Sequence, residues 1–136
     1  MSIKKEAYNV LESIVGLEHI SDDPVICEAY RCGPGGYECG LGYTKIMTKV
    51  PGAVIMPQTT EEVQKIVKIC NRYNVPYVPF STGFCGPRSH CHVDNELLID
   101  LKRMNHFEID EKHYYVVVGP GIVYSMLQEE VMKKGA

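Results

Sequence analysis

Residues 51–101 read PGAVIMPQTTEEVQKIVKICNRYNVPYVPFSTGFCGPRSHCHVDNELLIDL, and this stretch decides the fold. It contains three short apolar runs, at Ala53–Met56, Tyr77–Phe80 and Leu97–Leu101. Between the first two runs, apolar residues recur at the i, i+3, i+4 and i+7 positions of a helix, namely Val63, Ile66, Val67 and Cys70. The stretch therefore predicts a β-α-β unit with parallel strands.

The limits of the predicted helix are marked by its flanking residues. Thr59 and Glu62 have the spacing of a capping box at the start. Asn71 and Asn74 lie near the end, and Pro76 prevents the helix from continuing. We expect a helix over Val63–Asn71 at least.

The three apolar runs are expected to form one parallel sheet. We expect Ala53–Met56 and Tyr77–Phe80 to be neighbours, with Leu97–Leu101 as a third strand beside them. Pro79 lacks an N–H donor, so its position suits the end of a strand better than the centre. Because ligands of parallel sheets bind beyond the carboxyl ends of the strands, the loop after Phe80 is the first place to look for chemistry.

The flanking regions predict further elements. Ile3–Val15 has an amphipathic helical pattern that ends at Gly16, whereas residues 18–50 contain mainly a turn at Asp22-Asp23-Pro24 and the glycine-rich loop RCGPGGYECGLG. After residue 105 we expect a hairpin-like pair of strands and a final helix. The predicted strands are Phe107–Ile109 and Tyr114–Val118, and the helix is Ile122–Lys134 with Val123, Met126, Leu127 and Val131 facing inward.

Length and composition are those of one globular domain or part of one. The chain has 136 residues, of which 45% are hydrophobic and 23% charged. The net charge of −3 argues against nucleic acid as the main partner. The apolar runs are too short to span a membrane, and the first residues lack the core of a signal peptide. The composition therefore favours a cytoplasmic protein whose six cysteines are reduced thiols.

Three of the cysteines invite a metal-binding interpretation. Cys27, Cys32 and Cys39 are separated by four and six residues. These spacings fit neither a paired CxxC zinc site nor the usual ferredoxin pattern. Free thiols without a metal are therefore the favoured interpretation.

The segment Ser81-Thr82-Gly83-Phe84-Cys85-Gly86 has the composition of a phosphate-binding loop. A dinucleotide pyrophosphate needs close backbone N–H donors, which small residues allow, and hydroxyl groups can add further donors. The loop is not a Rossmann fingerprint, because no GxGxxG motif opens a helix after a strand. The motif alone is weak evidence for phosphate binding, and its position directly after a strand of the β-α-β unit is what strengthens it.

The order of these motifs resembles one family. The segments PGAVIMPQTTEEVQKIVKICNRYNVPYVPFSTG, LLIDLKRMN and YYVVVGPGIVYSMLQEEVMKKG are similar in order and spacing to the amino-terminal half of the FAD-binding domain of the vanillyl-alcohol oxidase/p-cresol methylhydroxylase flavoproteins. That family includes glycolate and D-lactate dehydrogenases. The resemblance implies an α/β (α+β) fold: a parallel β-α-β subdomain and the start of a second subdomain. It implies residues 1–46 as an N-terminal helix and lead-in, and residues 47–136 as a partial FAD-binding domain.

The resemblance also implies FAD as cofactor and a set of residues that contact it. The loop from residue 79 would hold the pyrophosphate, and the turn around residue 120 would approach the flavin side. The implied cofactor-binding residues are Pro79, Phe80, Ser81, Thr82, Gly83, Phe84, Cys85, Gly86, Arg88, Pro120 and Gly121. Relatives often have consecutive glycines in the first loop and glutamate at position 119, where this chain has Gly119. Some relatives attach flavin covalently to histidine, but a solvated loop is the favoured reading of His90 and His92.

Three functions from different classes remain open on the sequence. The first is the FAD-binding portion of a dehydrogenase or oxidase that acts on a hydroxy acid or an aromatic alcohol. The second is a non-catalytic subunit of the same fold that binds a partner chain without flavin, and the third is a cysteine-ligated metal protein. No catalytic residue can be nominated. We expect another chain or a further C-terminal part to complete the domain.

Overall fold

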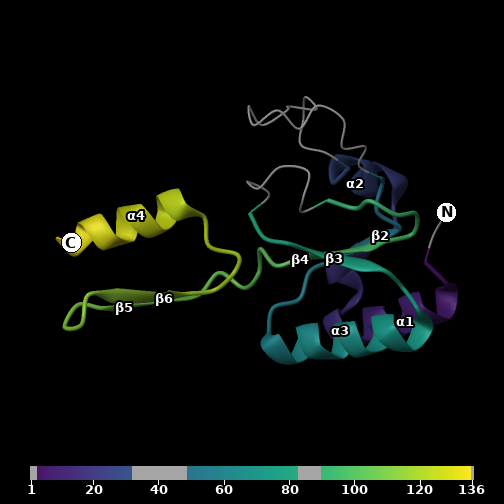
Figure 1. The fold of residues 1–136 in the computed structure, drawn as a ribbon, viewed down its shortest axis with the longest axis horizontal. Coiled ribbons are helices and arrows are strands. Elements are labelled where there is room, and N and C mark those ends of the chain that lie inside the picture. Colours follow the sequence, from purple (N-terminus) through teal and green to yellow (C-terminus); the bar gives the residue numbers. More distant parts are fainter. Residues whose placement is uncertain (1–2, 32–48, 83–89, 136) are drawn as a thin grey trace.

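The computed structural model describes residues 3–31, 49–82 and 90–135. Its elements are, in chain order, α1 (Lys5–Val15), η1 (Leu17–His19), β1 (Ile20–Ser21), α2 (Pro24–Ala29), β2 (Ala53–Ile55), α3 (Thr60–Tyr73), β3 (Tyr77–Phe80), β4 (Leu97–Asp100), β5 (Phe107–Asp110), β6 (Tyr115–Val118) and α4 (Tyr124–Lys133). Helices α1 and α3 cover one face of the main sheet and α2 lies on the other (Figure 1). The chain thus has the predicted α/β architecture.

The main sheet has the strand order β1-β2-β4-β3. Strand β4 pairs in parallel with both β2 and β3, and Leu97 lies opposite Ala53 on one side and Tyr77 on the other. Every residue of β2 and β4 is buried. Strands covered on both faces are apolar at successive positions, which explains the continuous runs AVI and LLI.

One predicted pairing is wrong: β2 and β3 are not neighbours, because β4 lies between them. The physical reason lies in the composition of the strands. The Leu97–Asp100 segment is buried at all four positions, whereas Tyr77–Phe80 alternates between exposed and half-buried. Pro79 has no N–H to donate to a neighbouring strand, so β3 is suited to the edge that it occupies.

Helix α3 begins and ends where its flanking residues require. The Thr59 hydroxyl accepts a hydrogen bond from the Glu62 N–H, as in a capping box, but the Glu62 carboxylate accepts from the Gln58 N–H, one residue before the position predicted. At the other end Asn74 adopts a left-handed conformation with φ of 53°. The observed helix, Thr60–Tyr73, is longer at both ends than the predicted minimum of Val63–Asn71.

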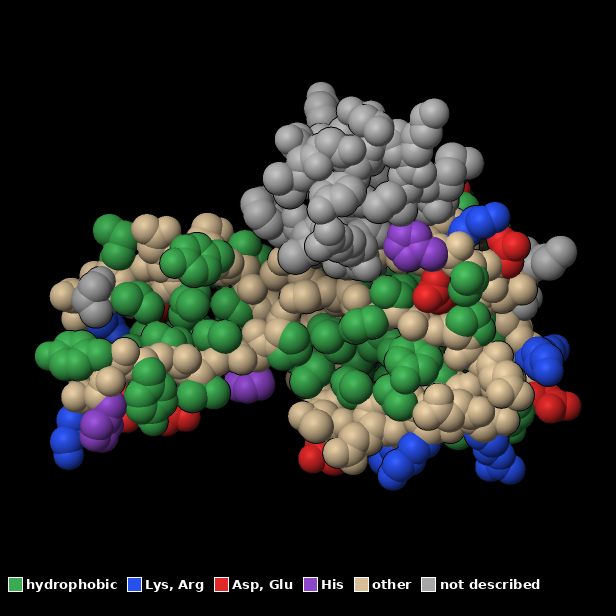
Figure 2. Space-filling model, viewed as in Figure 1, with side chains coloured by type: hydrophobic (Ala, Val, Ile, Leu, Met, Phe, Trp, Pro, Cys, Tyr) green, Lys and Arg blue, Asp and Glu red, His purple; other side chains and the backbone are tan. Residues whose placement is uncertain are grey.

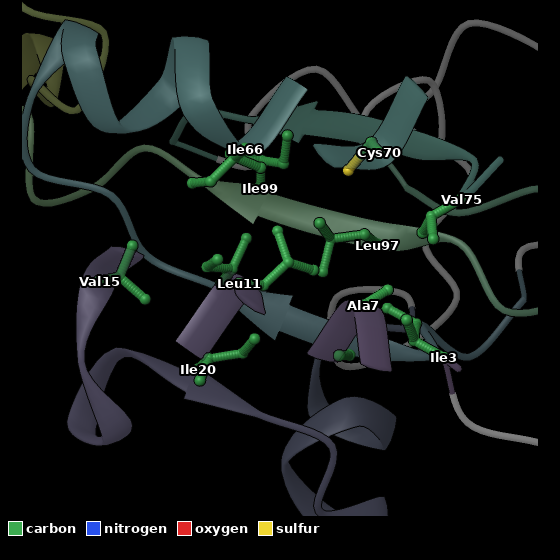
Figure 3. Packing of buried hydrophobic residues seen from close by; sticks show 12 residues of the cluster. Ile3, Ala7, Leu11, Val15, Ile20, Ile66, Cys70, Val75, Leu97 and Ile99 are labelled. Carbon is green, nitrogen blue, oxygen red and sulfur yellow. The ribbon is translucent and has the colours of Figure 1, made fainter. Parts of the chain in front are cut away.

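The main core lies between the sheet and the layer formed by α1 and α3 (Figure 3). Ala7 and Leu11 of α1 are fully buried there, as are Ile66 and Cys70 of α3. Gly16 ends α1 with φ of 88°, a backbone conformation that favours glycine. Strand β1, which the sequence analysis missed, follows this turn and pairs antiparallel with β2. Residues 3–20 thus share one core with the β-α-β unit, whereas Cys27 and Tyr30 pack in a second, smaller cluster.

A second, smaller part follows β4. Strands β5 and β6 form a two-stranded antiparallel sheet, and α4 runs beside it (Figure 1). Tyr114, predicted as a strand residue, lies in the turn with φ of 57°. The predicted inward face of the last helix is also wrong in part: α4 has no buried residue, and Val123 and Met126 are 44% and 58% exposed.

Much of this second part is apolar and open to solvent. Figure 2 shows hydrophobic side chains gathered over the part that contains β5, β6 and α4. The large exposed apolar residues here are Phe107, Tyr114, Tyr115, Val117, Val118, Val123, Tyr124, Met126 and Met132. None of the described helices combines the length and apolar character needed to cross a bilayer.

Candidate functional site

The site is built where β3 and β4 end together. Phe80 lies opposite Asp100 in the parallel register, so both strands deliver their last residues to the same edge. Ser81 and Thr82 follow β3 and are exposed there. Gly83, Phe84, Cys85, Gly86 and Arg88, which complete the predicted pyrophosphate loop, lie outside the described residues. The described part of the loop therefore starts at the edge expected for ligands of a parallel sheet.

A hydrogen bond joins the two segments predicted to contact the cofactor. The Ser81 hydroxyl donates to the backbone carbonyl of Pro120. These residues are 39 positions apart in the sequence, and nothing in the local pattern of either one predicts the contact. The beginning of the first predicted segment and the turn around Pro120 thus lie side by side.

The turn at Gly119-Pro120-Gly121 packs tightly on the chain that leaves β4. The Gly119 N–H donates to the His106 carbonyl, and the Gly121 N–H donates to the Met104 carbonyl. A Cβ atom on Gly121 would lie 2.5 Å from the Leu101 carbonyl oxygen, and one on Gly119 would clash with the Met104 carbonyl. Glycine is therefore required at both positions by close backbone approach, whatever the cofactor does.

Aromatic side chains gather beside this edge on the α2 face of the sheet. The Phe80 ring lies edge-on to Tyr30 at 5.7 Å and to His90 at 5.5 Å between centroids. His90 is buried, whereas His92 is exposed. The two histidines thus have different surroundings, and the favoured solvated-loop reading holds only for His92. A covalent bond to flavin at either residue is untested.

A polar cluster that was not predicted from the sequence lies at the same place. Asp100 is fully buried, and its carboxylate accepts hydrogen bonds from the Tyr30 hydroxyl at 2.6 Å and from the Lys102 N–H at 2.9 Å. The Lys102 ammonium lies 2.8 Å from the same carboxylate and donates to the Tyr30 oxygen at 2.6 Å. The available signal was an acid directly after three buried aliphatic residues, since a buried charge requires partners.

The pKa values of Tyr30 and Lys102 are both raised within this cluster. Burial and the hydrogen bond to Asp100 raise the pKa of Tyr30, so its hydroxyl stays neutral. Burial lowers the pKa of Lys102, but the hydrogen bonds to Asp100 and Tyr30 outweigh this effect and the net pKa is raised. The edge therefore carries a neutral phenol and a persistent ammonium group.

The cysteines of the described residues are buried free thiols. Burial raises the pKa of Cys27, of Cys70 to about 11 and of Cys91 to about 12. Cys32, Cys39 and Cys85 lie outside the described residues. In the segments that the structure describes, no group of three or more histidine, cysteine or acidic side chains could hold a metal ion.

A pocket of about 570 Å³ lies at the opposite, amino edge of the sheet. Gly52 precedes β2 and Asn95 precedes β4, and both line it together with Arg31 and Lys49. Parallel sheets bind ligands beyond the other edge, so this pocket is not the predicted cofactor site.

Comparison with known proteins identifies the family. A model described as an FAD binding domain matches residues 51–136, more than half of the chain. The chain therefore belongs to this family of FAD-binding domains, and the cofactor predicted from the sequence is confirmed as FAD. The Lys102 ammonium and the Thr82 hydroxyl fit this group, because both can donate hydrogen bonds to phosphate oxygens, whereas the single O–H of Ser81 is already donated to the Pro120 carbonyl.

Two curated relatives illustrate the match. The chain is 32% identical over 123 residues to the flavoprotein subunit of 4-cresol dehydrogenase [hydroxylating] from Pseudomonas putida, covering 84% of the chain and 22% of that protein. It is 36% identical over 89 residues to a glycolate oxidase subunit of Bacillus subtilis, covering 63% of the chain and 18% of that protein. The chain thus spans about a fifth of the length of these relatives.

Solved structures agree with the fold. A 4-ethylphenol oxidase from Gulosibacter chungangensis superposes with a TM-score of 0.76 at 30% identity, covering 98% of this chain and 26% of that one. A p-cresol methylhydroxylase with bound substrate gives 0.72 at 22% identity, with the same two shares of 98% and 26%. The resemblance drawn from the motif order is confirmed, whereas the individual site residues stay predictions.

Proposed function

We propose that this chain holds the diphosphate part of FAD in a flavin-dependent dehydrogenase or oxidase. The hydrogen bond from Ser81 to Pro120 is the observation that carries the proposal. It brings two separately predicted cofactor segments together at the carboxyl edge of β3. A ligand seated at this edge would touch both segments at once.

The described residues have clear roles in such a site. Thr82 is exposed, and its hydroxyl would donate a hydrogen bond to a phosphate oxygen. The Ser81 hydroxyl, already donated to the Pro120 carbonyl, would hold the turn in place. Gly121 lets the Pro120 turn lie against the chain that leaves β4, because a side chain there would clash with the Leu101 and Lys102 carbonyls. FAD, when bound, supplies the hydride acceptor of the reaction, and the protein supplies binding and orientation.

The proposed substrate is a small hydroxy acid or an aromatic alcohol. The relatives are named for 4-cresol and for glycolate, and a third relative from Arabidopsis thaliana is a D-lactate dehydrogenase. In such an oxidation the carbon that bears the hydroxyl loses a hydride, the hydroxyl loses a proton, and a carbonyl forms. The groups that hold the substrate would come from further parts of the enzyme, in the same polypeptide or in a partner.

Equilibrium binding of flavins to the purified chain tests the proposed role. FAD should bind and riboflavin should bind far more weakly, because riboflavin lacks the diphosphate that the edge recognises. Quenching of flavin fluorescence on titration provides the measurement. Equal binding of both ligands would refute diphosphate recognition, and no binding of either would favour a partner-binding subunit without flavin.

The complete enzyme tests the substrate class. Under anaerobic conditions, glycolate, D-lactate or 4-hydroxybenzyl alcohol should bleach the visible absorbance of the bound flavin. Reduction by dithionite shows that the flavin is competent. A flavin that dithionite reduces but none of these substrates reduces would contradict the proposed substrate class while leaving FAD binding intact.

A further inference from the structure

The cluster of Tyr30, Asp100 and Lys102 is built to hold an ammonium group in one place. Lys102 is joined to Asp100 at 2.8 Å and to the Tyr30 hydroxyl oxygen at 2.6 Å. The Tyr30 hydroxyl in turn donates to Asp100 at 2.6 Å. Each member therefore contacts the other two, and the three side chains form a closed triangle of hydrogen bonds.

The two charges of this triangle are unequally exposed. The Asp100 side chain is 0% exposed, whereas that of Lys102 is 54% exposed. Negative charge is thus withdrawn into the protein, and positive charge faces outward. A lysine ammonium has three N–H donors, of which Asp100 and Tyr30 take two. Among residues 3–31, 49–82 and 90–135 the third donor has no partner.

The position of the cluster connects it with the predicted cofactor segments. Lys102 lies two residues beyond the end of β4, next to the edge strand β3 that Ser81 follows. The Leu101 N–H donates to the Phe80 carbonyl, one residue before Ser81. A Cβ on Gly121 would lie 2.7 Å from the Lys102 carbonyl oxygen. The residue before Lys102 is therefore bonded to the end of β3, and the Lys102 backbone lies close to the turn at Gly121.

Other charged groups at this edge have different partners. The guanidinium group of Arg103 donates to the Met56 carbonyl and to the Gln58 side chain, which ties it to the loop between β2 and α3. Lys112, Lys133 and Lys134 belong to the second part of the chain. Lys102 is thus the described cation at the ends of β3 and β4 that a buried carboxylate holds in place and that still has a donor to offer.

We propose that Lys102 binds a phosphate oxygen of FAD and that Tyr30 and Asp100 are positioning residues for it. The proposal rests on the proposed function, because it assumes that FAD binds at this edge. It assigns the lead-in helix α2 a part in cofactor binding, since Tyr30 directly follows that helix. A cation held in advance loses less freedom on binding than an unrestrained lysine.

Titration of FAD at low and high salt tests the contact. Lys102→Met should weaken FAD binding about 10- to 100-fold, the range expected for one hydrogen bond to a charged group. The loss should shrink at high salt, because salt screens the same attraction in the wild-type chain. Lys112→Met removes an equal charge from the exposed hairpin turn and should leave binding unchanged.

Two further variants separate binding from folding. Lys102→Met leaves Asp100 buried without its cation, so the double variant Asp100→Asn/Lys102→Met removes both charges and preserves the size of the pair. Tyr30→Phe keeps the ammonium and removes one of its anchors, and it should weaken FAD binding less than Lys102→Met. Thermal unfolding followed by circular dichroism identifies the variants that are folded.

The outcomes are distinct. A wild-type chain that binds no FAD refutes the proposed function itself. A wild-type chain that binds FAD, with folded Lys102 variants that bind it equally well or lose affinity independently of salt, refutes the phosphate contact alone. Wild-type affinity in Tyr30→Phe refutes the positioning role of the phenol.

Discussion

Gly83 is the residue on which the predicted pyrophosphate loop depends most. If its backbone approaches the diphosphate closely, the Gly83→Val side chain should abolish FAD retention and leave the fold intact. Arg88→Ala should weaken FAD binding less, because an exposed charge contributes little. Flavin absorbance after gel filtration measures retention, and Gly135→Asn is the control, since its Cβ would meet nothing within 4 Å and asparagine tolerates the φ of 78° there. Stoichiometric FAD in Gly83→Val would remove the loop assignment.

The buried thiols give a prediction about reactivity. Because burial raises the pKa of Cys70 to about 11 and of Cys91 to about 12, only a small fraction of either is thiolate at pH 8. For Cys70 that fraction is about one in a thousand. Both thiols should therefore react slowly with a disulfide reagent in the native protein, and faster as the pH rises towards these pKa values.

A count of reactive groups checks this prediction. We expect six free thiols in denaturant and no stoichiometric iron or zinc. Mass spectrometry of labelled peptides identifies the slow cysteines. Rapid labelling of Cys70 or Cys91 in the folded chain would contradict the burial of these side chains, and a count well below six would contradict free thiols throughout.

The elements show what the sequence could and could not reveal. Periodicity and capping residues predicted α3 and the parallel β-α-β unit, because these signals are local. The order of the strands was mispredicted, although Pro79 in β3 already favoured an edge position for that strand. Helix α2 was read as a turn although its signal was present: Asp23 caps it and Pro24 occupies its first position.

The residues of the candidate site were predicted in part, whereas the contacts between them were not. Ser81 and Pro120 were both nominated, but their contact is a tertiary property that only the folded chain reveals. Asp100 was counted as part of an apolar strand, and its partner Tyr30 lies 70 residues away. Such long-range polar pairs leave no periodic trace in a sequence.

The N-terminus of α3 offers a matched pair of threonines. Thr59 caps the helix through its hydroxyl, whereas Thr60 is the first helical residue and is exposed. Thr59→Ala should lower the free energy of unfolding by about 0.5–2 kcal/mol. Thr60→Ala should change it by a few tenths of a kcal/mol at most, in the range of surface substitutions. Urea unfolding measures both, and equal effects would contradict the cap.

The exposed apolar side chains of β5, β6 and α4 predict how the whole chain behaves alone. A two-stranded sheet leaves its backbone edges available for pairing, and Val117 is 50% exposed on it. We expect the isolated chain to self-associate or to show little dehydrogenase activity. Val117→Lys should reduce association, whereas Val25→Lys, at a site 79% exposed on α2, should not.

Light scattering after gel filtration measures this association. A monodisperse monomer of 15.3 kDa that oxidises D-lactate or an aromatic alcohol with an artificial dye would contradict the expectation. A lower association state for both lysine variants would show that the contact is not confined to the second part of the chain.

The central claim is that the carboxyl edge of β3 and β4 binds FAD, and native mass spectrometry of the chain incubated with FAD tests it most directly. The account predicts one bound FAD for each copy of the chain, lost in Gly83→Val and diminished in the Lys102→Met variant. An absence of any FAD adduct on the folded wild-type chain would contradict the claim, and so would an adduct that persists unchanged in both variants.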